Sequence, residues 1–231
     1  MNVENLQKYC TNTISSSLLD IFKFNSRIIV NGFSFSGKTR LCINLLKKYF
    51  YKIDKIIVAD CPNHHEISNE KSIKSKVEIL DHIPSISEIK ANYVGHIVII
   101  LDDNYTKSFN SENVLSYFTA GRHNNISCIL ICQNMFFSQG KYSRDITLNA
   151  SHIILLKMRD LTQIQILARQ IFGKNYSNRI LEIYKFIQKN YKWGHLLIDV
   201  SQSSTPDIEL RSNIAIINEE DNFETCYKIL N

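Results

Sequence analysis

A short hydrophobic segment that runs into a glycine-rich loop constrains this chain more than any other feature. Residues 27–31 read Arg-Ile-Ile-Val-Asn, which is typical of a buried strand. Residues 32–39 then read Gly-Phe-Ser-Phe-Ser-Gly-Lys-Thr, and apolar residues at helical spacing follow to residue 51. A strand, this glycine pattern and a helix together predict a phosphate-binding loop. A glycine turn with an incidental lysine is the alternative, and the flanking elements argue against it.

Each residue type in the loop suits the binding of a nucleoside triphosphate. Glycines permit backbone torsions and a close ligand approach that a Cβ would prevent. The loop amides, with the positive end of the helix dipole, can surround the β- and γ-phosphates. Lys38 neutralises phosphate charge, and the Thr39 hydroxyl ligates Mg²⁺. The residues expected to bind ATP are Gly32, Phe33, Ser34, Phe35, Ser36, Gly37, Lys38, Thr39 and Arg40.

A second hydrophobic strand, at residues 95–101, is followed by two carboxylates, Asp102 and Asp103. In open α/β sheets, ligands bind at the carboxyl ends of the strands. We expect Asp102 to hold Mg²⁺ directly or through water, and Asp103 to orient or deprotonate the attacking water. Two aspartates that only cap the strand are the alternative. Their place downstream of a phosphate loop favours the catalytic role.

A third hydrophobic strand, at residues 126–132, ends in Gln133, beside the strand that carries the aspartates. A side-chain amide at this place can sense the γ-phosphate or position the attacking water. The alternative is a buried glutamine that satisfies loop amides.

Two arginines flank the third strand in segments expected to be loops, Arg122 and Arg144. An arginine finger can accelerate nucleotide hydrolysis by about 10³–10⁵-fold. We expect Arg122 or Arg144 to reach the nucleotide of a neighbouring subunit, with Arg159 and Arg169 as further options. For each of them, a surface charge or a salt bridge is the alternative.

The pattern along the whole chain predicts an α/β fold of three layers, with a mostly parallel central sheet as in P-loop (RecA/ASCE-like) NTPases. Residues 25–218 form the expected ATPase domain, residues 1–24 a helical extension before it, and residues 219–231 a tail. Strands are expected at 27–31, 55–60, 77–80, 95–101, 126–132, 151–157, 195–200 and 213–217. Helices are expected at 39–51, 86–91, 111–119, 160–172 and 177–189.

Composition places the chain among folded intracellular proteins. Of its 231 residues 44% are hydrophobic and 21% charged, and no apolar run is long enough to span a membrane or to form a signal peptide. We therefore expect a soluble protein that is not secreted. The net charge of +5 is compatible with nucleic-acid binding without indicating it.

The six cysteines are scattered, and several lie in apolar runs, so we expect reduced, buried thiols rather than disulfides. The segment 61–65, Cys-Pro-Asn-His-His, suggests zinc. It lacks the partner ligands of a tetrahedral site, so a plain loop is the favoured interpretation.

Several motifs in fixed order resemble the poxvirus-type genome-packaging ATPases of the FtsK–HerA superfamily, found in large DNA viruses and in Polinton (Maverick) elements. The similarity covers residues 27–200. It is carried by the phosphate loop, the Asp-Asp strand and the segments 118–127 (Phe-Thr-Ala-Gly-Arg-His-Asn-Asn-Ile-Ser), 133–136 (Gln-Asn-Met-Phe), 143–150 (Ser-Arg-Asp-Ile-Thr-Leu-Asn-Ala), 159–160 (Arg-Asp) and 193–199 (Trp-Gly-His-Leu-Leu-Ile-Asp).

This resemblance implies an ATP-hydrolysing, ring-forming motor that drives double-stranded DNA, without sequence preference, into a preformed capsid. It implies Mg²⁺, a capsid or portal vertex as partner and an arginine that acts between subunits. It also implies work inside the host cell, in a virus factory or the nucleus, with the virion as a further location. The roles fall on Lys38, Thr39, Asp102, Asp103 and Gln133, and on Arg122 or Arg144 as the finger.

Two other functions stay open at this stage. A P-loop nucleoside or nucleotide kinase would need an arginine-rich lid over the phosphates, and no such segment is evident. A nucleotide-switched protein that binds DNA or a capsid would bind ATP without continuous translocation.

Overall fold

One continuous sheet forms the middle of the molecule. The computed structural model describes residues 12–14, 22, 25–50, 52–62, 64–102, 104–204, 209–212, 214 and 225–227. Within these residues ten strands pair in the order β1-β10-β9-β8-β7-β2-β6-β5-β3-β4. Their bounds are β1 (Asn12–Ile14), β2 (Arg27–Asn31), β3 (Lys55–Ala59), β4 (Val77–Leu80), β5 (Ile97–Leu101), β6 (Ile126–Cys132), β7 (His152–Leu155), β8 (Leu196–Asp199), β9 (Leu210–Ser212) and β10 (Thr225–Tyr227).

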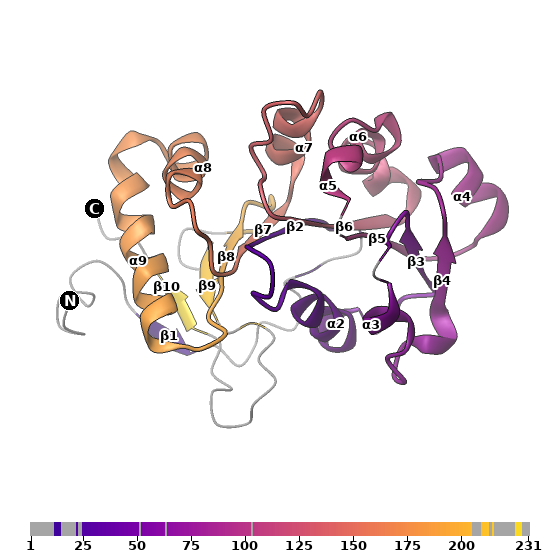
Figure 1. Cartoon of the computed structure of the whole chain (residues 1–231), viewed down its shortest axis with the longest axis horizontal. Helices are drawn as coiled ribbons and strands as arrows, with labels where there is room; N and C mark the ends of the chain where they lie inside the picture. The colour runs from indigo at the N-terminus through magenta and orange to yellow at the C-terminus, as the bar shows by residue number, and fades with distance from the viewer. Residues whose placement is uncertain are drawn as a thin grey trace.

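Helices cover both faces of this sheet (Figure 1). Helices α2 and α3 lie on one face, and α4 to α8 lie on the other. None of the helices within the described segments combines the length and the apolar character needed to cross a bilayer. The α-helices are α2 (Lys38–Tyr49), α3 (His65–Ser68), α4 (Ile86–Asn92), α5 (Tyr105–Ser108), α6 (Glu112–Thr119), α7 (Ser143–Asn149), α8 (Thr162–Phe172) and α9 (Ser177–Asn190).

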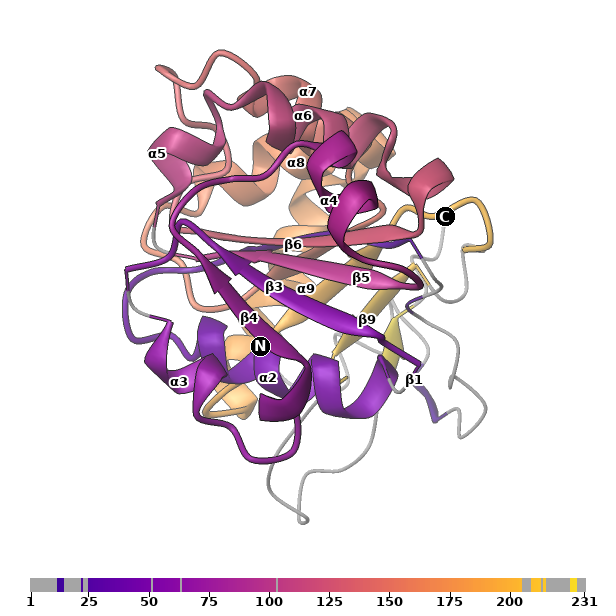
Figure 2. The same cartoon turned by 90° about the vertical axis from the view of Figure 1, so that its right-hand side faces the viewer.

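The six strands from β7 to β4 run parallel, and the other four extend the sheet beyond β7 by antiparallel pairing. Strand β6 pairs with β2 on one side and with β5 on the other, so β2 and β5 do not pair with each other. Figure 2 shows β6, β5, β3 and β4 fanned across the sheet, with the right-handed twist that adjacent strands adopt. The mostly parallel α/β sheet expected from the sequence is therefore present.

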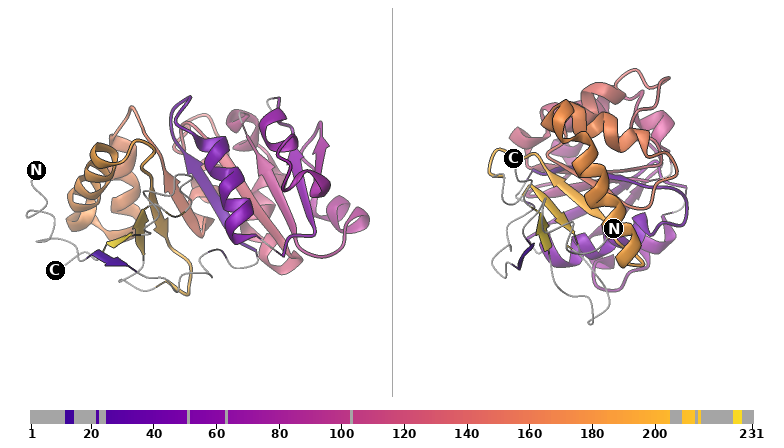
Figure 3. Two further views of the ribbon diagram at one scale, coloured as in Figure 1. Left: turned by 90° about the horizontal axis from the view of Figure 1, so that it is seen from below. Right: turned by 90° about the vertical axis from the view of Figure 1, so that its left-hand side faces the viewer.

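Two cores follow from the alternation of side chains along the buried strands. On one face, Ile29, Ile57 and Ile99 pack with residues of α4, α6, α7, α8 and α9. On the other face, Ile28 and Val30 pack with the apolar side of α2, which lies across the sheet in Figure 3. Because strands β2, β5 and β6 are buried on both faces, their sequences are continuously hydrophobic rather than alternating.

The structure departs from the expected elements in several places. Residues 12–14 of the expected helical extension form strand β1, because they pair with β10, a long-range pairing that local spacing does not reveal. The rest of residues 1–24, except Phe22, lies outside the described residues. Of the strand expected at 213–217 only Ile214 is described, in a turn that follows strand β9. Segments expected to be loops contain the short helices α3, α5 and α7.

The described cysteines are free thiols, as expected: Cys42, Cys61, Cys128 and Cys132 are all buried. Burial raises the pKa of Cys132 to about 12, so this thiol stays protonated at neutral pH. The side chains of Cys10 and Cys226 lie outside the described residues.

His195, just before β8, is a buried histidine held in its neutral form. Its Nε2 accepts a hydrogen bond from the Ile214 amide at 3.2 Å, and its Nδ1 donates to the Trp193 carbonyl at 3.3 Å. A second proton would place an N–H group against the Ile214 amide. Burial lowers the pKa of His195 to about 4, and burial also lowers the pKa of His96 to about 4.

We predict that stability falls when the pH is lowered from 7 to 5. Each of these histidines has a folded pKa below the unfolded value of 6.5, so the unfolded chain binds protons first as the pH falls from about 6.5 towards 4. The free energy of unfolding, measured with urea, should drop by about 2 kcal/mol per histidine.

The variant His195→Gln should lose less stability over this range than the wild type. His82→Gln is the matched control, because hydrogen bonds to Asp81 and Glu88 raise the pKa of the exposed His82, so its removal should not reduce the loss. An identical pH dependence in His195→Gln and the wild type would contradict this account.

Candidate active site

The strand order gathers the ends of β2, β6 and β5 at one edge of the sheet. Asn31 pairs with Cys132, and Leu101 pairs with Leu130, so these three strands end almost level with one another. The residues that follow them are therefore neighbours in space. The phosphate loop, Asp102 and Gln133 lie at this edge, as the sequence predicts.

The loop between β2 and α2 requires both of its glycines. A Cβ on Gly32 would lie 2.6 Å from Ser36 Oγ and 3.0 Å from Leu156 Cβ, too close for either to remain in place. Gly37 has a φ of +90°, a backbone conformation that residues other than glycine rarely adopt. Phe35, two residues before Gly37, also has a positive φ, +62°, and Phe35 is 98% exposed.

Helix α2 begins at the end of this loop with nothing that would compete with an anion. Gly37 supplies no side-chain cap, and the first turn contains no acidic residue. The first amides of a helix of 12 residues therefore point, with the dipole, toward the loop. Lys38 is buried and its ammonium donates to the Phe33 carbonyl at 3.1 Å, on the other side of the loop. The hydroxyl of Ser36 is buried and has no hydrogen-bond partner among the described residues.

A hydrogen bond joins the loop helix to the strand that carries the aspartates. Thr39 Oγ1 donates to Asp102 Oδ2 at 2.7 Å, and the Asp102 side chain is only 3% exposed. A hydroxyl and a carboxylate are the hard oxygen ligands that Mg²⁺ prefers. These two groups therefore fit a magnesium ion beside the loop. Asp103, the expected water-activating residue, lies outside the described residues.

Gln133 faces a small pocket next to the loop rather than the protein interior. Its side chain is exposed, so the alternative of a buried glutamine does not apply. The pocket has a volume of about 190 Å³ and lies between the loop and the segment after β7. Its described lining consists of Phe33, Ser34, Gln133, Met158, Arg159, Asp160 and Gln163.

Arg159 lies at the loop of its own chain. Its guanidinium carbon is 5.6 Å from the centre of the Phe33 ring, within the range of a cation–π contact. The Phe33 ring thus contacts Arg159, while the Phe33 amide donates to the Lys157 carbonyl at 3.0 Å. Sequence reasoning gave Arg159 only as a further option for an arginine finger.

Trp193 flanks the other side of the loop. A Cβ placed on Gly37 would lie 3.5 and 3.7 Å from two of its ring carbons, and the side chain is 55% exposed. The residue reaches this edge because β8 runs antiparallel to β7, with Leu196 opposite Leu155. This contact could not be predicted from the sequence, because Gly37 and Trp193 are far apart in the chain.

The two arginine-finger candidates lie at different places. Arg122 is exposed in a 3₁₀ turn (Gly121–Asn124) before β6, at the opposite edge of the sheet from Gln133. Arg144 is exposed and lies in the first turn of α7. The loop expected here is wrong, because residues 143–149 form a short helix. Arg40 turns away from the loop and pairs with Glu70 at 3.6 Å.

The segment that suggested zinc contains no metal site in its described part. No group of three or more metal-binding side chains occurs among the described residues, and His65 begins α3. Asn63 lies outside them.

Solved structures with a similar fold come from a viral packaging protein. The genome packaging NTPase B204 from Sulfolobus turreted icosahedral virus 2 was solved with AMPPCP, sulfate and ATP-gammaS. In that order, the three structures match this chain with TM-scores of 0.56, 0.57 and 0.56 and sequence identities of 18%, 17% and 16%. The matches cover 84%, 86% and 85% of this chain, and 100% of the B204 chain in each case. No protein-family model and no curated protein matches the sequence. The fold is therefore the three-layer α/β fold of a P-loop NTPase, as expected from the sequence.

We predict that Thr39→Val lowers the free energy of unfolding by about 1–3 kcal/mol, because the buried Asp102 carboxylate loses a charge-assisted hydrogen bond while the shape of the side chain is kept. Urea unfolding without nucleotide measures this loss. Thr119→Val is the control: its hydroxyl bonds only to exposed helix carbonyls, so the change should stay within about 0.5 kcal/mol. Equal stability of the two variants would contradict a structural link between Thr39 and Asp102.

Proposed function

We propose that this protein hydrolyses ATP to move double-stranded DNA into a preformed viral capsid, as a member of the poxvirus-type packaging ATPases. The observation that carries the catalytic part is the 2.7 Å contact between Thr39 and Asp102, beside a buried lysine and an uncapped helix start. The similarity in fold to a viral genome-packaging NTPase, solved with nucleotide analogues, supports the biological part.

In this proposal the loop amides and Lys38 hold the β- and γ-phosphates. Lys38 would exchange its bond to the Phe33 carbonyl for phosphate oxygens. Thr39 and Asp102 would hold Mg²⁺, which when bound neutralises charge on the phosphate oxygens. The residue after Asp102, Asp103, orients or deprotonates the attacking water, and Gln133 positions that water from the end of β6.

Several features support a motor that works as a ring around DNA. A packaging motor must contact phosphates rather than base edges, because it has to grip any sequence. The net charge of +5 on each chain, repeated around a ring, suits such contacts. The fully exposed Phe35 at the tip of the phosphate loop fits a site that a neighbouring subunit completes. Arg122 or Arg144 of that neighbour would reach the γ-phosphate.

The proposed partners and location follow from this role. The ring would dock on a capsid or portal vertex inside the host cell, in a virus factory or the nucleus, and would accompany the virion if it stays docked.

We predict that duplex DNA stimulates phosphate release from ATP, and that Lys38→Ala lowers this release by about 10²-fold or more. Lys185→Ala, at an exposed lysine on α9, should release phosphate like the wild type. Phosphorylation of a nucleoside would instead indicate a kinase, and negligible release a nucleotide switch. DNA-stimulated turnover that survives Lys38→Ala would contradict the site assignment.

Trp193 provides an independent measure of binding, because it is the single tryptophan of the chain and lies against Gly37. Adding ATP should change its fluorescence in the wild type. Asp103→Asn should keep this change while it stops hydrolysis, which separates a defect in chemistry from a defect in binding.

Mixing subunits tests the intersubunit arginine. We predict that Arg122→Ala or Arg144→Ala subunits, added to wild-type subunits, lower turnover more than dilution accounts for, because each defective arginine would silence its neighbour's site. Lys185→Ala, which removes an exposed positive charge on α9, is the control and should only dilute. If turnover falls only in proportion to the fraction of variant subunits, for both Arg122→Ala and Arg144→Ala, neither arginine acts across the subunit interface.

A further inference from the structure

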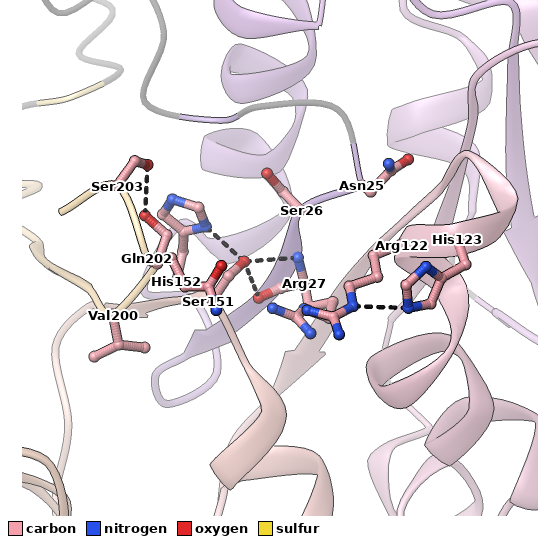
Figure 4. Close-up of a pocket in the computed structure, with 11 residues that line it drawn as sticks. Asn25, Ser26, Arg27, Arg122, His123, Ser151, His152, Val200, Gln202 and Ser203 are labelled. Atoms are coloured by element: carbon pink, nitrogen blue, oxygen red, sulfur yellow. Dashed lines mark hydrogen bonds between the residues drawn. The ribbon is translucent and has the colours of Figure 1, made fainter.

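A second pocket, of about 500 Å³, lies at the sheet edge opposite the phosphate loop (Figure 4). Arg27 opens β2 and pairs with Cys128 near the start of β6, whereas the loop follows the other end of β2. Five residues of strand separate the two edges by roughly 15 Å. The described lining consists of Asn25, Ser26, Arg27, Arg122, His123, Ser151, His152, Val200, Ser201, Gln202 and Ser203.

This pocket concentrates positive charge without a counter-charge. Figure 4 shows the side chains of Arg27 and Arg122 directed toward one another across it. Among the described residues that line the pocket, none is acidic. The nearby Asp199 is buried on β8 and already pairs with His152 at 3.5 Å and Arg211 at 3.3 Å.

Most hydrogen-bond donors of the two arginines have no partner among the described residues. A guanidinium carries five N–H donors. Arg27 donates from Nη1 to the Phe118 carbonyl at 3.3 Å, and its Nε is buried without a partner among the described residues. Arg122 donates from Nε to His123 Nε2 at 3.1 Å. Neither arginine forms an ion pair with a described carboxylate.

The fold holds these two like charges together at a cost. Burial, and the charge of Arg122 in second place, lower the pKa of Arg27. An anion between the guanidinium groups would offset both effects, since its charge would attract both arginines and it would accept from their remaining donors. A pair of arginines that served only packing would be expected to have a carboxylate or more carbonyl partners.

We propose that Arg27 and Arg122 form a second phosphate-binding site, separate from the phosphate loop. Planar guanidinium groups match the oxygens of a phosphate, and Arg is the residue suited to such bidentate contacts. The pocket has room for more than one phosphate, so a phosphate that belongs to a larger molecule also fits it. Two sources share this chemistry: the backbone of duplex DNA, and a nucleotide bound to an adjoining subunit.

Binding of pyrophosphate tests the site without requiring ATP turnover. The parent protein for this experiment is the Lys38→Ala variant, in which the phosphate loop contributes less to pyrophosphate binding. In calorimetry, adding Arg27→Gln or Arg122→Gln should weaken pyrophosphate binding by about tenfold or more, the loss expected for one charge-assisted hydrogen bond. Lys185→Gln, at an exposed position on α9, is the control and should leave pyrophosphate binding unchanged. Arg122 is exposed, so its replacement is compatible with folding even if Arg27→Gln is not.

Two further measurements identify the source of the phosphate. If it belongs to DNA, Arg122→Gln should weaken duplex binding and lower the slope of log affinity against log salt by about 1. If it belongs to a neighbour's nucleotide, duplex binding should be unchanged, and Arg27→Gln subunits should lower turnover of mixed assemblies beyond dilution.

Pyrophosphate binding that is the same with and without both arginines would overturn this second site. That outcome would leave the proposed ATPase untouched, because the ATPase stands or falls with Lys38→Ala in the wild-type background.

Discussion

The hydrogen bond between Thr39 and Asp102 joins two parts of the chain that are 63 residues apart, and the rest of the site is arranged around it. It can form because β2, β6 and β5 lie side by side in this order, so the phosphate loop after β2 and Asp102 after β5 lie at the same edge of the sheet. The parallel register then fixes where Gln133 and Arg159 lie, since each follows a strand next to β2. Packing of α2 against one face of the sheet holds the loop in place.

The two edges of the sheet differ in a way that matters for function. At the carboxyl edge lie the phosphate loop, the buried Lys38 and the buried Asp102 carboxylate. At the amino edge, two arginines face each other without a described acidic partner. In our two proposals, a short strand thus separates two anion sites: one built from main-chain amides and metal ligands, the other from guanidinium groups.

Sequence patterns were most informative where the signal is local. The loop, Asp102 and Gln133 could be located because glycine spacing and hydrophobic strands are local properties, and the longer helices could be located from their periodicity. Arg159 and Trp193 could not be placed, because they reach the loop from segments more than 100 residues away through strand pairing. The short α7 was missed because seven residues give little periodicity. β1 was taken for helix because its partner, β10, lies at the other end of the chain.

A crystal structure with a non-hydrolysable ATP analogue and Mn²⁺ tests the central claim most directly, since anomalous scattering locates the metal without ambiguity. The account predicts phosphate oxygens on the amides of residues 32–39 and one Mn²⁺ peak about 2.1 Å from Thr39 Oγ1, with Asp102 bound to the ion or linked to it by a water. A triphosphate bound elsewhere, or a metal peak remote from both Thr39 and Asp102, would contradict it.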